Sequence, residues 1–407
     1  MTSRWWPITL AALAALAYTG LSPAIGGEAI APYPAAVATR QPPHPTVARS
    51  AGALADVLKQ ATITGQLPSM SAAIASSDGL VWSASYGWAD IEHRVAATPD
   101  SRYRTGSMAK PITAVAMMRL VERGLLDLDE PLGTRIEGLS GDARAITPRQ
   151  LASHTAGVRH YTLAEGMLGT LGLGRRTHYD TVQAGLRPFI QDPLRFKPGT
   201  DFLYSTFGYS LLSRRLELAA GAPFPRILAD EVFKPCGMSA TDVDSGGPAA
   251  NRVSFYRTQQ GKFKPAMDMD TSGRIAGGGL LATAEDLAKF GQCTFQGPLL
   301  GEQARRMLAT PVTLANGEAN PQHYGLGWRI DDSTRLFGTE HPTRIIHHGG
   351  KQEGGAGFLL VVPGLGVSVA VMTNSASGDA REHAQETAYA LMRAFASATG
   401  MTSARGE

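Results

Sequence analysis

The stretch Thr105-Gly106-Ser107-Met108-Ala109-Lys110-Pro111-Ile112-Thr113 predicts the start of a helix with a serine and a lysine on one face. Residues three apart on a helix are neighbours, so a helix beginning at Ser107 places the Lys110 amine beside the Ser107 hydroxyl. A serine must lose its proton as it attacks, and an amine can accept that proton when burial lowers the pKa of the amine. Unpaired N–H groups at a helix start also favour an oxyanion nearby. The stretch is therefore typical of an activated serine nucleophile.

The same spacing also arises from a capping serine followed by a solvated lysine, which is the structural alternative. The residues that follow argue against that alternative. Apolar side chains continue at helical spacing, at Ile112, Val115, Met118, Val121 and Leu125. Gly124 supplies a stop, and Pro111 falls in the first turn, where a missing N–H costs little. We therefore expect Lys110 at the start of a buried helix.

Composition and charge narrow the class of protein. The chain has 407 residues, 43% hydrophobic and 18% charged, which suits one large or two modest globular domains. The formal net charge of +3 is spread along the chain, so we expect no nucleic-acid partner. Cys236 and Cys293 either form a disulfide in an oxidising compartment or remain buried free thiols. Neither has a histidine at a metal-like spacing, and we expect no metal and no cofactor.

The first 24 residues have the pattern of a secretory signal peptide. Arg4 gives a positive start, residues 7–21 form an apolar run, and Ser22-Pro23-Ala24 places small residues before a cleavage point. The alternative is an uncleaved membrane anchor, but the run is about 15 residues, shorter than the roughly 20 that a span needs. We therefore expect a periplasmic or secreted protein with no stable membrane span after cleavage.

Predicted strands gather at the two ends of the chain, and predicted helices occupy the middle. Runs of β-branched or aromatic residues between turns predict strands over residues 70–75, 80–86, 327–330, 344–348, 357–362 and 367–373. Helices are expected over residues 50–62, 210–219, 284–290 and 381–395, and Thr147 with Pro148 opens another. This order favours an α+β fold, with one antiparallel sheet flanked by the terminal helices.

The same pattern divides the chain into segments. After the signal peptide (residues 1–24), an Ala- and Pro-rich linker is expected over residues 25–48. The folded domain is expected over residues 49–397. Its sheet part would comprise residues 49–104 and 322–397, and a mainly helical part, residues 105–321, would be inserted between them.

Two further segments contain side chains suited to catalysis or binding. The aromatic-rich stretch Phe202–Tyr209 supplies either core residues or, at Tyr204, a phenol beside an ammonium ion that can act as a base. His347-His348-Gly349-Gly350 ends a predicted strand, where adjacent side chains point to opposite faces, so one histidine can face a cleft. That geometry disfavours a zinc site, and the glycines allow a substrate to approach closely. His154 is expected to hold a loop.

Together these segments resemble the serine β-lactamase and penicillin-binding family, on its class C and D-alanyl peptidase/esterase side. Ser107-Met108-Ala109-Lys110 matches the first motif, and Tyr204-Ser205-Thr206 stands at the second, normally Tyr-x-Asn. His347-His348-Gly349 stands where the family has Lys-Thr-Gly or His-x-Gly. Supporting matches at residues 153–157, 196–199 and 277–283 follow the family's order. The resemblance implies a β-lactamase/transpeptidase-like fold.

A closer resemblance is to the mitochondrial β-lactamase-like serine peptidases of that family. It rests on residues 154–161, Asp192-Pro193-Leu194 and Tyr204–Tyr209. The segment between residues 161 and 192 is short here and lacks their long charged insertion. We therefore do not extend their filament formation to this chain.

The resemblance implies roles for the motif residues. Ser107 would attack an acyl carbonyl, and Lys110 and Tyr204 would share the proton transfers. The N–H groups of Ser107 and Gly350 would form the oxyanion hole. The chain has no Glu-x-x-Leu-Asn motif, so the class A deacylation route does not apply.

Substrate contacts would come from Thr206, His347, His348 and Gly349. Thr206 is shorter than the usual asparagine and has no amide, so we do not expect the substrate hydrogen bond that the asparagine amide makes in the family. His347 would replace the lysine of the third motif. Because a histidine is largely neutral near pH 7, it should hold a substrate carboxylate less firmly.

The sequence therefore predicts an exported serine hydrolase. It would cleave amide or ester bonds of a small-molecule or peptide substrate through an acyl-Ser107 intermediate, as a peptidase, an esterase or a weak β-lactamase. The alternative is a non-catalytic protein of the same fold that binds peptides or cell-wall fragments, or acts as a scaffold. The intact Ser107, Lys110 and Tyr204 argue against that alternative.

Overall fold

The computed structural model describes residues 28–29, 32–41, 43–133, 135–162, 165, 177–259 and 262–401. The expected signal peptide, residues 1–24, lies outside the described residues. No helix within the described ranges combines the length and the apolar character that a membrane crossing needs.

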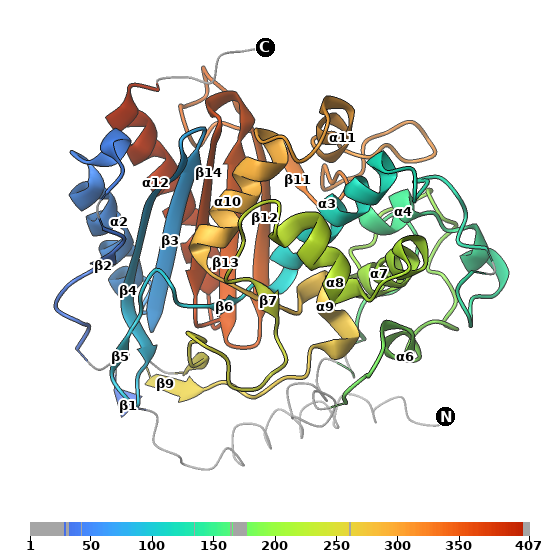
Figure 1. Ribbon diagram of the computed structural model, residues 1–407, viewed down its shortest axis with the longest axis horizontal. Helices are drawn as coiled ribbons and strands as arrows, with labels where there is room; N and C mark the ends of the chain where they lie inside the picture. Colours follow the sequence, from blue (N-terminus) through green and yellow to red (C-terminus); the bar gives the residue numbers. More distant parts are fainter. Residues whose placement is uncertain are drawn as a thin grey trace, which may run out of the picture.

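An antiparallel sheet forms the centre of the fold, in the order β11-β12-β13-β14-β3-β4-β2, with β5 paired to β4 (Figure 1). Its strands are β2 (Ala38–Thr39), β3 (Ser69–Ser76), β4 (Gly79–Asp90), β5 (Val95–Ala96), β11 (Arg329–Ser333), β12 (Thr343–Gln352), β13 (Gly355–Val362) and β14 (Val367–Thr373). The pairing of β14 with β3 joins the two ends of the chain. The predicted α+β fold with one antiparallel sheet is therefore confirmed.

Helices cover both faces of this sheet (Figure 1). α2 (Ala51–Thr64) and α12 (Ala380–Thr399) pack on one face, where they share a core with Phe358, Leu360 and Val369. α10 (Ala284–Phe295) packs against β14 and β3 on the other face. Because both faces are covered, every residue of β3, β13 and β14 is buried.

The remaining helices form a layer beside the sheet, at the right of Figure 1. They are α3 (Ala109–Glu122), α4 (Pro148–Ala152), α6 (Val182–Leu186), α7 (Thr206–Ala220), α8 (Phe224–Leu228), α9 (Ile275–Gly278) and α11 (Glu302–Leu308), with a wider helical turn at Ala229–Phe233. One small sheet joins β6 (Tyr103–Arg104), β10 (Leu280–Ala282) and β7 (Asp242–Val243). A second joins β1 (Glu28–Ala29), β9 (Lys262–Pro265) and β8 (Tyr256–Gln259).

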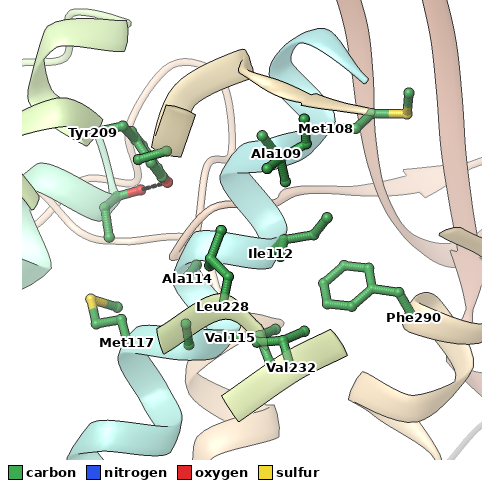
Figure 2. Close-up of a cluster of buried hydrophobic side chains, with 14 of the residues drawn as sticks. Met108, Ala109, Ile112, Ala114, Val115, Met117, Tyr209, Leu228, Val232 and Phe290 are labelled. Carbon is green, nitrogen blue, oxygen red and sulfur yellow. Dashed lines mark hydrogen bonds between the residues drawn. The ribbon is translucent and has the colours of Figure 1, made fainter. Parts of the chain in front are cut away.

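The α3 helix runs through the middle of the larger hydrophobic core. Figure 2 shows Ile112 and Val115 in a cluster with Leu228, Val232 and Phe290 of α10, and all five side chains are fully buried. A helix that is apolar on all sides needs such surroundings, and they hold it in a fixed position. The expectation that the Ser-x-x-Lys stretch opens a buried helix is confirmed.

The two cysteines form a disulfide. Cys236 follows the Ala229–Phe233 turn, and Cys293 lies on α10, with their Cα atoms 5.5 Å apart. The bond therefore ties the helical layer to the helix that covers the sheet. Of the two alternatives that the sequence left open, the structure has the disulfide.

Candidate active site

The nucleophile lies on a tight turn pressed against β12. Residues Gly106–Met108 form a single 3-10 turn, and α3 continues from it, so Ser107 stands at the start of the helix as expected. Gly106 has φ +51°, and a Cβ there would lie 2.7 Å from the Lys351 nitrogen. A Cβ at Gly350 would lie 2.0 Å from the Thr105 carbonyl oxygen. Glycines on both sides thus let the turn and the strand meet.

Lys110 is fully buried beneath Ser107. Its Nζ atom lies 3.2 Å from Ser107 Oγ, 3.3 Å from Thr206 Oγ1 and 2.7 Å from the Gly277 carbonyl oxygen. A Cβ at Gly277 would lie 2.5 Å from Thr206 Cγ2, so a glycine is needed for this approach. Burial lowers the pKa of Lys110 to about 7, because an ammonium ion is poorly solvated there. A large fraction of the amine is therefore free base near neutral pH.

Tyr204 lies beside both Lys110 and Ser107. The Lys110 Nζ atom is 4.8 Å from the centre of the Tyr204 ring, and the tyrosine is hydrogen-bonded to Ser107. Burial raises the pKa of Tyr204 to about 12, although the bond to Ser107 acts in the opposite direction. The phenol therefore keeps its proton near neutral pH, which differs from the expectation of a phenolate base.

His154 supports the tyrosine from below. Its Nδ1 atom accepts a hydrogen bond from the Ser205 N–H at 3.1 Å, and its carbonyl oxygen accepts one from the Leu203 N–H at 2.9 Å. The His154 and Tyr204 ring centres are 4.2 Å apart. Its left-handed backbone, with φ +64°, turns the loop so that both contacts form. These contacts match the structural role expected from the sequence.

His348, rather than His347, faces the nucleophile. Its Nδ1 atom donates to the Gly349 carbonyl oxygen at 2.7 Å, so Nε2 is the acceptor for the Tyr324 hydroxyl at 2.9 Å. Burial and the charge on Lys110 hold the pKa of His348 well below its usual range. The side chain is therefore a neutral imidazole with both nitrogens occupied.

The prediction that His347 faces the site is wrong. Its ring stacks on Phe358 in the core beneath α12, and its Nε2 atom lies 2.6 Å from Asp331. Gly349 faces the same way, since a Cβ there would lie 3.3 Å from Arg381 Cδ. Alternation along a strand explains both placements, because His347 and Gly349 share one face of β12 and His348 and Gly350 share the other.

This difference of one residue also changes which backbone N–H lies beside the nucleophile. The family resemblance placed that N–H at Gly350. In the structure the Lys351 nitrogen is the atom next to Gly106, and Gly350 packs on Thr105. The Lys351 side chain leads away and reaches the Gly378 carbonyl oxygen at 3.3 Å. A His-x-Gly motif counted from His348, rather than from His347, would have found this position.

A cavity of about 210 Å³ opens beside Ser107. Its wall includes Tyr161, Thr206, Arg274, Gly278 and Gln352. The sequence did not single out Arg274 or Gln352. Within the described ranges, no group of three or more His, Cys, Asp or Glu side chains is arranged to hold a metal ion.

The Beta-lactamase family matches residues 54–392 of the chain. The chain belongs to this family. Its antiparallel sheet with flanking helices is the β-lactamase/transpeptidase-like fold. The resemblance identified from the motifs is thus confirmed.

Among curated relatives, the chain is similar to the mitochondrial serine β-lactamase-like protein LACTB from Homo sapiens. The two are 27% identical over 366 residues, which is 70% of this chain and 66% of LACTB. Protein flp from Staphylococcus aureus (strain MRSA252) is 22% identical over 76% of this chain and 60% of flp. The chain thus spans 60% to 66% of these relatives' lengths.

Solved structures agree on the fold. The octameric penicillin-binding protein homologue from Pyrococcus abyssi has a TM-score of 0.71 at 23% identity, covering 86% of this chain and 78% of that one. A D-stereospecific amidohydrolase from Streptomyces sp. has a TM-score of 0.68 at 24% identity, covering 83% and 98%. EstCE1, a hydrolase with promiscuous acyltransferase activity, has a TM-score of 0.70 at 20% identity, covering 84% and 99%.

Proposed function

We propose that the protein cleaves ester or amide bonds through an acyl-enzyme on Ser107. The observation that carries the proposal is the fully buried Lys110 amine, with a pKa of about 7, held 3.2 Å from the Ser107 hydroxyl. A general base is most effective when its pKa lies near the working pH. An ordinary surface lysine is almost fully protonated at pH 7 and cannot serve.

In acylation, Ser107 Oγ attacks the carbonyl carbon and its proton passes to Lys110 Nζ. The N–H groups of Ser107 and Lys351 donate to the oxyanion, in place of the pair with Gly350 that the resemblance implied. Tyr204, protonated near neutral pH, gives its proton to the departing alcohol or amine, and the Lys110 ammonium restores it. A water molecule then attacks the acyl-enzyme through the same proton transfers, which releases the acid and restores the Ser107 hydroxyl.

The third motif limits which substrates bind well. His348 is neutral, and its two nitrogens are engaged by Gly349 and Tyr324. It therefore offers no positive charge to a substrate carboxylate. We propose that small esters and amides without such a carboxylate are cleaved more readily than β-lactams.

Hydrolysis of 4-nitrophenyl acetate and of amino-acid amides tests the proposal, with Ser107→Ala as the control. The wild-type protein should turn over at least one of these substrates, and Ser107→Ala should lose the activity while keeping its circular dichroism spectrum. Turnover by Ser107→Ala near the wild-type rate would overturn the assignment of the nucleophile. Binding of substrate without turnover by the wild type would favour the non-catalytic alternative.

A further inference from the structure

Gln352 stands on the face of β12 that meets the nucleophile turn. It follows His348 and Gly350 at alternate positions, so its side chain leaves the strand toward Gly106 and Gly278. Its Oε1 atom would lie 3.7 Å from a Cβ at Gly278, and the same Cβ would lie 3.5 Å from the Gly106 carbonyl carbon. The amide is therefore beside the turn that carries Ser107, in the wall of the same cavity.

This amide is not used by the protein itself. Both Nε2 and Oε1 of Gln352 are buried and have no hydrogen-bond partner within the described part of the chain. The next residue is held differently, because Arg104 donates to the Glu353 carbonyl oxygen at 2.8 Å and Arg257 pairs with its carboxylate. The strand is thus anchored immediately beyond Gln352, and its amide remains uncommitted. Buried polar groups of this kind usually have a partner, which points to a binding role.

The amide contact expected of the second motif is missing at Thr206. The Thr206 side chain has no amide, and its hydroxyl is engaged by Lys110 at 3.3 Å. Gln352 lines the same cavity as Thr206 and carries one amide donor and one amide acceptor. A peptide-like group presents the complementary pair, whereas a carboxylate or an ammonium ion can use only one half of it.

We infer that Gln352 is a specificity-determining residue that binds an amide in the acyl part of the substrate. The inference rests on the proposed function and gives its substrate class: N-acylamino esters and peptides, rather than simple fatty-acyl esters. The side-chain carbonyl would accept from the substrate N–H, and the side-chain N–H would donate to the substrate C=O. No bond in the protein must break for this contact to form.

Two esters with the same leaving group and chain length test the inference. N-acetylglycine 4-nitrophenyl ester carries the amide, and 4-nitrophenyl pentanoate replaces it with methylene groups. In Gln352→Met, kcat/KM for the amide ester should fall roughly tenfold relative to that for the pentanoate, as expected for one or two lost hydrogen bonds. Gln352→Glu, which keeps an acceptor but loses the donor, should also reduce the preference.

Gln292→Met is the matched control, since Gln292 on α10 also has a buried Oε1 atom without a partner and lies outside the cavity wall. It should leave the ratio of the two esters unchanged. Wild-type and Gln352→Met proteins that hydrolyse both esters with the same ratio would overturn the inference and leave the proposed function intact. A wild-type protein that hydrolyses neither ester, nor any other acyl substrate, would overturn the proposed function and the inference with it.

Discussion

At the scale of single residues, the pKa of Lys110 sets the expected pH dependence. The amine accepts the Ser107 proton only as free base, and burial lowers its pKa to about 7. The rate of acylation should therefore rise with pH and reach half its plateau near pH 7. The pH profile of kcat/KM, which reports groups of the free enzyme, measures this. A profile that is flat from pH 5 to 9, or that falls across this range, would contradict the role of Lys110.

We expect Thr206 and His348 to limit the activity of the protein on β-lactams. The double variant Thr206→Asn, His348→Lys restores the amide and the cation that the family has, so nitrocefin turnover should rise at least tenfold relative to ester turnover. The control is Thr206→Asn with His347→Lys, because His347 faces the core beneath α12. Equal ratios in the two double variants would show that His348 does not occupy the third-motif position.

Sequence patterns were sufficient to predict contacts between residues that lie close together along one helix. Ser107 and Lys110 are three apart, so their contact follows from helical geometry alone. It was harder to predict which of His347 and His348 faces the site, because a shift of one residue along a strand exchanges its two faces. Gln352 gives no sequence signal, since a polar residue at the end of a strand is usually solvated.

At the scale of elements, the last part of β12, beyond its pairing with β11, forms one side of the site. β11 pairs with β12 from Thr343 to His347, and β13 pairs with it as far as Gln352. The nucleophile turn lies against the last part of β12. The predicted strand ended at His348, because two consecutive glycines usually end a strand. Here the glycines continue the strand, since Gly350 must lie against Thr105.

The helix that carries Thr206 also began earlier than its apolar pattern indicated. α7 starts at Thr206 rather than at Ser210, because Ser205 Oγ accepts a hydrogen bond from the Gly208 N–H at 3.0 Å. This cap fixes the segment between His154 and α7. It thereby positions both Tyr204 and Thr206 beside the Lys110 amine.

The disulfide between Cys236 and Cys293 should contribute to stability but not to chemistry. It closes a loop with a sequence separation of 57 residues. The double variant Cys236→Ser, Cys293→Ser should lose roughly 2–4 kcal/mol of unfolding free energy in urea, with ester kcat/KM unchanged under native conditions. Unfolding midpoints that coincide, with and without reductant, would show that the bond does not constrain the unfolded chain.

At the scale of the whole molecule, the ends of the chain meet in one sheet. This closure was predictable because the terminal strands have strong patterns and short turns. The position of α10 was not predictable from the sequence. This helix lies within residues 105–321, which were expected to form the helical part, but it packs on β14 and β3 of the sheet. An amphipathic helix shows that one face is buried but does not identify the partner.

We also propose that the protein is exported. The basis is the positive start, apolar run and small residues of the first 24 positions. The mature chain should begin near Ile25 and be recovered from the periplasm or the medium of a bacterial host. N-terminal sequencing checks this, and a mature protein that retains residues 1–24 would favour the membrane anchor.

The central claim is that Ser107 forms a covalent acyl-enzyme. Labelling with a fluorophosphonate, followed by tryptic mass spectrometry, tests it most directly. Cleavage after Arg104 and Arg119 releases residues 105–119, because the Lys110–Pro111 bond resists trypsin. The account predicts one adduct on this peptide, located at Ser107, and none in Ser107→Ala. An unlabelled wild-type protein, or an adduct that persists in Ser107→Ala, would contradict it.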